Sequence, residues 1–185
     1  MRLFVGIPLA PVVLNELSKV TARLRSSTDD LRWTSSDSWH ITLQFLGNSS
    51  PEQYPCLVAH LSQLKGSPVP IHLGRLGIFD RAGVFFAEVD ATPSLVSLAE
   101  QILAATSHCG FVAETRPFHP HITLARAKSQ GRSRSLQELA QRVQRQPAFL
   151  HYVASEFLLY ESHLASTGAT YEVRHRFPLT ASAGS

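Results

Sequence analysis

The tetrapeptide His-Ile-Thr-Leu occurs at His40–Leu43 and again, unchanged, at His121–Leu124. In a β-strand, side chains two residues apart point to the same face. Each copy is therefore predicted to place its histidine and threonine on one face, and its isoleucine and leucine on the other. Two such strands facing each other would bring two imidazoles and two hydroxyls to one site, with two aliphatic side chains anchoring each strand from behind.

Two opposed histidines are suited to splitting a phosphodiester bond by proton transfer. Free imidazole titrates near neutral pH, so one ring can accept a proton from water while the other, protonated, donates one. The candidates are His40 and His121. The hydroxyls of Thr42 and Thr123 can donate hydrogen bonds to the non-bridging phosphate oxygens, where negative charge gathers. The repeat thus predicts an acid–base site for an anionic phosphodiester.

The composition is that of an ordinary globular protein. Of the 185 residues, 44% are hydrophobic and 17% are charged, and the formal net charge is +3. This mild positive charge is compatible with an anionic substrate but does not by itself indicate one. We expect a single domain over residues 1–185. No stretch approaches the length of a membrane span and no signal peptide is evident, so we expect a cytoplasmic protein that does not bind membranes. We also expect a monomer.

The two cysteines, Cys56 and Cys109, lie far apart and outside any Cys-x-x-Cys pattern. This spacing predicts two ordinary buried thiols in a reducing compartment. The expectation of a cytoplasmic protein rests in part on that reading.

Hydrophobic periodicity and turn residues predict strands and helices mixed along the chain. The expected strands are 3–7, 41–46, 71–79, 84–89, 118–125, 155–160 and 170–177, and the expected helices are 11–24, 51–64, 95–106 and 135–143. Ser50 with Gln53, and Ser135 with Glu138, are the expected capping residues of the second and fourth helices, and Pro55 is expected to delay or kink the start of the second. These elements fall into two similar halves, each with one copy of the repeat. We predict an α+β fold of two pseudo-symmetric lobes, each an antiparallel sheet with helices packed outside, around a central cleft. Residues 181–185 are expected to be frayed.

The run His119-Pro120-His121 offers an alternative, because two histidines two residues apart on a strand can chelate zinc. A zinc site needs three or four ligands, and the nearby carboxylates are only Asp37 and Glu114. Pro120 also disturbs the strand geometry that chelation needs. We therefore predict no metal and no other cofactor. A serine hydrolase is disfavoured too, because no Gly-x-Ser-x-Gly motif occurs.

Two residues that closely follow the repeats are harder to place. By strict alternation Arg126 points with Leu124, away from the histidines, and a strand end or bulge is needed to bring it to the site. Phe45 follows the first copy in the same way. It is predicted to be a core residue rather than a platform for stacking a nucleobase.

Longer matches surround the repeats. The segments Trp39–Gly47 and Phe118–Arg126, together with Arg2–Val5 near the start and several positions between Ser162 and Leu179, resemble the 2H phosphoesterases. Within that group the chain is similar to the bacterial and archaeal RNA 2′,3′-cyclic phosphodiesterases, also called 2′-5′ RNA ligases. The resemblance spans nearly the whole chain, in order.

The resemblance implies metal-independent hydrolysis of RNA 2′,3′-cyclic phosphate ends to a 2′-phosphate, and association with 2′-5′ ligation of tRNA halves, formally the reverse reaction. Carried onto matching positions, it makes His40 the proton donor to O3′ and His121 the proton acceptor that activates water. Thr42 and Thr123 would hold the phosphate, and Arg126 would contact the nucleotide. The two copies look equivalent in the sequence, so the order of the histidines rests on the resemblance alone.

Two other functions would use the same pair of repeats. A non-catalytic protein could bind RNA ends through it, although a pure binder has no use for two titratable groups in mirrored positions. A related esterase could act on small cyclic nucleotides instead of RNA. Product analysis and a comparison of mononucleotide with oligomer distinguish these functions.

Overall fold

The structure is a computed structural model that describes residues 1–26, 30–112, 114, 116–128, 133–143, 151–165 and 168–180. The expected fraying of residues 181–185 lies outside the described residues. The helices are α1 (Pro11–Leu24), α2 (Gln53–Leu61), α3 (Pro93–Ser107) and α4 (Arg134–Arg142). The strands are β1 (Arg2–Pro8), β2 (Leu31–Trp33), β3 (His40–Asn48), β4 (Val69–Ile71), β5 (Leu73–Phe79), β6 (Val84–Val89), β7 (His121–Ala127), β8 (Tyr152–Ala154), β9 (Glu156–Ala165) and β10 (Gly168–Pro178).

The strands build two four-stranded sheets and one short pair. Sheet A has the order β10-β9-β1-β3, sheet B has the order β2-β7-β6-β5, and β4 pairs with β8. All pairings among the described residues are antiparallel. The predicted α+β fold of two antiparallel lobes is confirmed.

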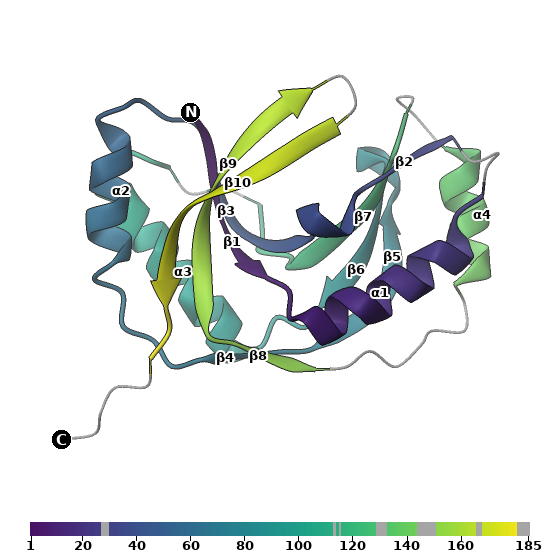
Figure 1. Cartoon of the computed structure of the whole chain (residues 1–185), viewed down its shortest axis with the longest axis horizontal. Helices are drawn as coiled ribbons and strands as arrows, with labels where there is room; N and C mark the ends of the chain where they lie inside the picture. Colours follow the sequence, from purple (N-terminus) through teal and green to yellow (C-terminus); the bar gives the residue numbers. More distant parts are fainter. Residues whose placement is uncertain are drawn as a thin grey trace.

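The sequence predicts lobes made from consecutive halves of the chain, and this part of the prediction is wrong. Sheet A combines strands from both ends of the chain, because β1 lies between β3 and β9. Sheet B takes β2 from the first part of the chain and β5, β6 and β7 from the middle. The helices flank the sheets: α2 and α3 lie beside sheet A, and α1 and α4 lie beside sheet B (Figure 1).

The local signals that begin the helices are only partly confirmed. At α2, Ser50 and Gln53 form the expected capping box: the Ser50 N–H donates to Oε1 of Gln53 over 2.9 Å, and the Gln53 N–H donates back to the Ser50 hydroxyl over 3.4 Å. At α4 the cap is Ser133, whose hydroxyl accepts the N–H three residues on. Ser135, the predicted cap, instead accepts a hydrogen bond from the Asp30 N–H.

The prediction of two free thiols is wrong. Cys56 and Cys109 form a disulfide that links α2 to the residues just after α3. The two helices pack against each other, which brings the two Cα atoms to 5.8 Å, within reach of a disulfide. The expectation of a cytoplasmic location loses the support of free thiols and stays a prediction, as does the monomer.

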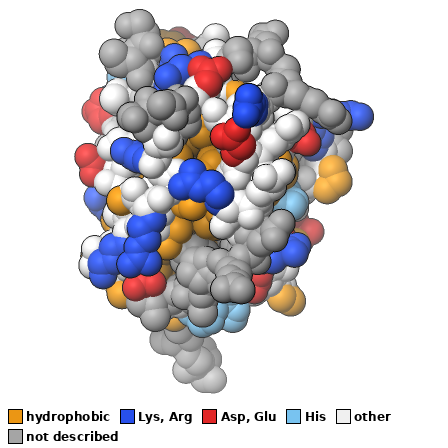
Figure 2. Space-filling view, turned by 90° about the vertical axis from the view of Figure 1, so that its right-hand side faces the viewer, with side chains coloured by type: hydrophobic (Ala, Val, Ile, Leu, Met, Phe, Trp, Pro, Cys, Tyr) orange, Lys and Arg blue, Asp and Glu red, His pale blue; other side chains and the backbone are white. Residues whose placement is uncertain are grey.

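None of the helices in the described ranges combines the length and the apolar character needed to cross a membrane. Figure 2 shows the face on the side of α1 and α4, where Lys and Arg side chains are interspersed with Asp, Glu and hydrophobic side chains. The chain has a formal net charge of +3, but the Lys and Arg side chains on this face do not form a continuous basic surface.

Candidate active site

The two His-Ile-Thr-Leu repeats open strands β3 and β7. In both copies the histidine and threonine are partly exposed and the isoleucine and leucine are buried, with Ile41 and Ile122 fully so. The two strands contact each other where the sheets meet. The predicted alternation is confirmed in both strands, and both His-Thr pairs lie on the face opposite the aliphatic anchors.

Each histidine ring is held by the same backbone contact. Nδ1 of His40 lies 2.8 Å from the carbonyl oxygen of Ser38, and Nδ1 of His121 lies 2.8 Å from that of His119. A carbonyl oxygen only accepts hydrogen bonds, so Nδ1 carries the hydrogen in both rings and Nε2 is the atom left to exchange a proton. In His40 this Nε2 lies 3.1 Å from the hydroxyl of Thr42, which donates to it when the ring is neutral.

A β-bulge after the second repeat turns Arg126 toward the histidines. Thr123 and Ala125 of β7 pair with consecutive residues of β6, so Leu124 is an extra residue in the strand. Leu124 and Ala125 are both buried, and the exposed Arg126 returns to the face of His121. The positive charge of Arg126 lowers the pKa of both histidines. Strict alternation would point Arg126 away from the histidines unless a strand end or bulge intervened, and the structure has a bulge there.

The first repeat carries the same irregularity. Thr42 and Gln44 of β3 pair with consecutive residues of β1, so Leu43 is the extra residue. Leu43 and Gln44 are both buried, and Phe45 is 58% exposed. The prediction that Phe45 belongs to the core is wrong, because the bulge moves its ring to the histidine face. Phe45 and Arg126 thus occupy equivalent positions, one supplying an aromatic ring and the other a guanidinium.

Aromatic rings from three other strands surround His40. Its ring centroid lies 4.6 Å from that of Phe4 on β1, 5.6 Å from that of Tyr160 on β9 and 5.0 Å from that of Tyr171 on β10. Phe4 and Tyr160 also stack on each other, with centroids 4.8 Å apart. The sequence does not predict these neighbours, because Tyr160 and Tyr171 lie more than 100 residues from His40 along the chain.

His121 lies against a second aromatic pair. The rings of Phe79 and Phe86 lie in T-shaped contact with its ring, at centroid distances of 5.1 and 5.6 Å, and these two phenyl rings stack at 4.0 Å. Gly77 makes room for this arrangement, because a Cβ at that position would lie 2.9 Å from the Phe86 ring. Both motif histidines therefore sit in largely apolar surroundings.

These surroundings disfavour the charged imidazolium. Burial lowers the pKa of His40 from its ordinary value of 6.5 to about 4; the hydrogen bond to Ser38 opposes the change, and the charges of His121 and Arg126 add to it. Burial also lowers the pKa of His121, opposed by the bond to the His119 carbonyl and aided by the charges of His119 and Arg126. Both rings are therefore mainly neutral at pH 7 in the free protein.

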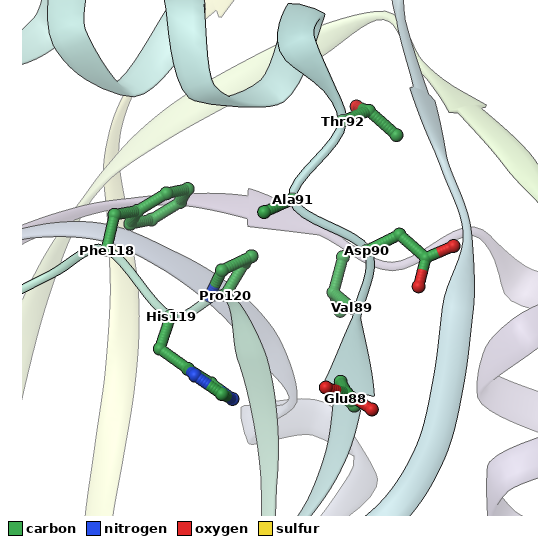
Figure 3. A pocket seen from close by; sticks show the side chains of 8 residues that line it. All are labelled: Glu88, Val89, Asp90, Ala91, Thr92, Phe118, His119 and Pro120. Carbon is green, nitrogen blue, oxygen red and sulfur yellow. The ribbon is translucent and has the colours of Figure 1, made fainter.

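A pocket of about 410 Å³ lies just before β7 and is lined in part by His119 and Pro120, the two residues that precede His121 (Figure 3). It is formed where the end of β6 and the segment leading into α3 face the residues that precede β7. Its lining residues are Glu88, Val89, Asp90, Ala91, Thr92, Phe118, His119 and Pro120. Neither His40 nor His121 lines it, so this pocket does not contain the His-Thr pairs.

The zinc alternative finds no third ligand in the part of the chain that the structure describes. The ring centroids of His119 and His121 are 6.3 Å apart. No group of three possible metal ligands among the described residues includes either of them. Chelation at this position would thus rest on two histidines alone, fewer than a protein zinc site uses.

Residues 13–164 match the sequence profile of the 2′-5′ RNA ligase superfamily. The chain belongs to this superfamily. The match covers both repeats and the strands that carry them, so the resemblance read from the motifs is confirmed.

Named relatives of this superfamily member include the RNA 2′,3′-cyclic phosphodiesterase of Geobacillus stearothermophilus, 29% identical over 181 residues. That alignment covers 95% of this chain but only 56% of the relative. The protein of the same name from Thermotoga maritima is 29% identical over 178 residues, covering 94% of this chain and 92% of the relative. The crystal structure of Escherichia coli LigT complexed with 3′-AMP superposes with a TM-score of 0.79 at 26% identity, covering 97% of this chain and 98% of that one.

Proposed function

We propose that this protein hydrolyses the 2′,3′-cyclic phosphate ends of RNA to a 2′-phosphate, by acid–base catalysis without a metal. The observation that carries the proposal is the duplicated His-Thr pair, in which each Nδ1 is fixed by a backbone carbonyl two residues earlier and each Nε2 is left for proton transfer. The names of the relatives, RNA 2′,3′-cyclic phosphodiesterase, support the same reaction.

In the proposed reaction, Nε2 of His121 takes a proton from water as the water oxygen bonds to phosphorus. The bond between phosphorus and O3′ breaks, and Nε2 of His40 protonates the departing O3′, which leaves the phosphate on O2′. The hydroxyls of Thr42 and Thr123 donate hydrogen bonds to the non-bridging oxygens. Thr42 exchanges its resting bond to His40 for one to the phosphate.

The low pKa of His40 in the free protein constrains this role, because a proton donor must carry its proton. A phosphate anion close to Nε2 stabilises the imidazolium and raises that pKa. We therefore propose that substrate binding itself charges His40, whereas His121 remains neutral and able to accept a proton. Arg126 opposes protonation of both rings in the free protein, and its guanidinium is neutralised when the phosphate binds.

Arg126 and Phe45, the exposed residues that follow the two bulges, are proposed to bind the nucleotide. Arg126 offers a planar donor for a phosphate oxygen or a base edge, and the exposed ring of Phe45 offers a stacking surface for a base. An RNA end presents both features at once. A small cyclic nucleotide presents them too, so the relative rates on a mononucleotide and an oligomer decide which is the better substrate. Ligation through a 2′-5′ bond would use an RNA 5′-hydroxyl in the reverse direction.

The central experiment is product analysis on a short RNA with a 2′,3′-cyclic end, in excess EDTA. We expect a 2′-phosphate product. His40→Ala and His121→Ala should each lower kcat/KM by about 100-fold to 10,000-fold, whereas His163→Ala, at an exposed position on β9, should not. RNA binding without any product would indicate the non-catalytic binder. Loss of turnover of the disulfide-bonded protein in EDTA, with recovery on added zinc, would refute the metal-free scheme.

A modified substrate separates the two histidines. When sulfur replaces the bridging 3′ oxygen, the leaving thiolate departs without a proton. The activity lost in His40→Ala should then largely return, while that of His121→Ala should stay low. The opposite pattern would reverse the two roles and leave the overall reaction intact.

A further inference from the structure

Four side chains of types that can bind a metal gather where α2 meets the end of α3, on elements other than the strands that carry the repeats. The ligand atoms of Cys56, His60 and Cys109 all lie within 4.8 Å of one another. The ring of His108 stacks on that of His60, with centroids 5.0 Å apart and planes 16° from parallel. Two sulfurs and two imidazoles therefore share one small region.

We propose that reduction of the Cys56–Cys109 disulfide converts this cluster into a zinc-binding site. Cys56, His60 and Cys109 would supply three ligands, and His108 the fourth. The same two sulfurs would then be either bonded to each other or bound to one zinc ion.

The positions of the ligands on the helices favour this exchange. Cys56 and His60 are four residues apart on α2, so they share one face of the helix. In a tetrahedral site with Zn–S of about 2.3 Å and Zn–N of about 2.0 Å, ligand atoms lie roughly 3.3 to 3.8 Å apart. The present separations are within 4.8 Å, so side-chain rotations and an opening of the S–S pair suffice. His108 is the C-cap of α3 and is exposed, which leaves its ring free to turn.

The chemistry balances with a dithiol as reductant. The dithiol gives two electrons and two protons, becomes a disulfide itself, and leaves two thiols on the protein. Zinc displaces the two thiol protons, and the two thiolates offset its charge in a Cys2His2 site. A disulfide acting as oxidant would accept the two electrons, become a dithiol, restore the Cys56–Cys109 bond and release the metal.

The site has a structural consequence near the repeats. α3 packs on β3, and the hydroxyl of Thr106 on α3 donates to Oε1 of Gln44, the buried residue that follows the bulge of β3, over 2.8 Å. A crosslink between α2 and α3 therefore steadies the support of the first repeat. Zinc would supply that crosslink in a reducing environment, where the disulfide is absent.

Metal binding to the whole protein tests the proposal. The disulfide is opened with a phosphine, because dithiols themselves bind zinc, and Co²⁺ and Zn²⁺ are then added. The reduced protein should bind one Zn²⁺ per chain and should show the thiolate-to-cobalt charge-transfer and tetrahedral d–d bands with Co²⁺. The oxidised protein should show neither. Cys56→Ser/Cys109→Ser should abolish binding, and His60→Ala should weaken it at least tenfold.

Two controls make the outcome decisive. His119→Ala should bind zinc like the wild type; loss of zinc in that variant with retention in the double cysteine variant would place the metal at His119 and His121 and overturn the proposal. So would a disulfide that resists the phosphine in the folded protein, as measured by thiol titration. Circular dichroism shows whether the double variant is folded, and Cys56→Ser alone provides a second variant that removes one ligand.

Discussion

His40 should stay uncharged in the free protein at pH values where an ordinary histidine has gained a proton. The expected pKa is about 4, against an ordinary 6.5. The gap of 2.5 units corresponds to about 3 kcal/mol at 1.36 kcal/mol per unit. This is an upper bound, since the ring is half-buried. The cause is the aromatic enclosure by Phe4 and Tyr160, so the shift should depend on those rings.

The same shift makes folding stability depend on pH. Between pH 6.5 and about 4 the unfolded chain binds a proton at His40 that the folded chain does not. The free energy of unfolding should therefore fall as the pH drops through this window, by up to about 3 kcal/mol from this residue. The lowered pKa of His121 acts in the same direction. His40→Asn should flatten the curve.

Two measurements check this. Long-range ¹H–¹⁵N correlation spectra report the pKa and the tautomer of His40 directly, and urea unfolding at steps between pH 7 and 4 reports stability. Nδ1 should carry the hydrogen in the neutral ring, and a bound 2′-nucleotide should raise the pKa. A free-protein pKa of 6.5 or above, or an anion that leaves it unmoved, would refute the reasoning that burial and substrate charge set the state of this ring.

Further predictions concern Arg126 and Phe45, which follow the two bulges, and Gly77, which packs against the Phe86 ring. Arg126→Ala should lower kcat/KM by about 10-fold to 100-fold, because a charged hydrogen bond contributes about 1.5 to 3 kcal/mol; Arg32→Ala on the neighbouring strand, which faces Arg126 in the register, is the matched comparison, and an equal loss in both would point to general charge attraction. Phe45→Ala should raise KM for RNA about 10-fold through lost stacking, and should leave KM unchanged for a cyclic phosphate without a base. Gly77→Ala should destabilise the fold by about 1 to 3 kcal/mol and lower kcat, since its Cβ would lie 2.9 Å from the Phe86 ring; thermal unfolding and steady-state kinetics test this, and unchanged values of both would contradict the packing described.

The alternation of side chains within the two repeats and most helices and strands could be predicted from the sequence, because they depend on local residue patterns. The sequence could not place Phe45 and Arg126, because a bulge arises from the pairing of one strand with another. The extra residues Leu43 and Leu124 are visible only when the registers with β1 and β6 are known. Each bulge reverses the alternation that follows it, and an ordinary aliphatic residue marks the place.

Contacts between residues distant in the sequence could not be predicted for a related reason. Cys56 and Cys109 are 53 residues apart, and nothing in their spacing shows that two helices will pack side by side. The rings around His40 likewise come from strands at opposite ends of the chain. Hydrophobic periodicity shows that each strand has a buried face, but it does not show which strand lies next to it.

The position of β1 between β3 and β9 sets the order in which the protein can be completed during synthesis. The four strands of sheet B have all been translated once residue 127 is made. Sheet A must wait, because β1 gains its second neighbour only when the ribosome has added β9, and β10 ends at residue 178. For most of translation the N-terminal strand therefore has one unpaired edge. A chain that ends before β9 would keep both histidines but would lack Tyr160 and Tyr171, which pack against His40.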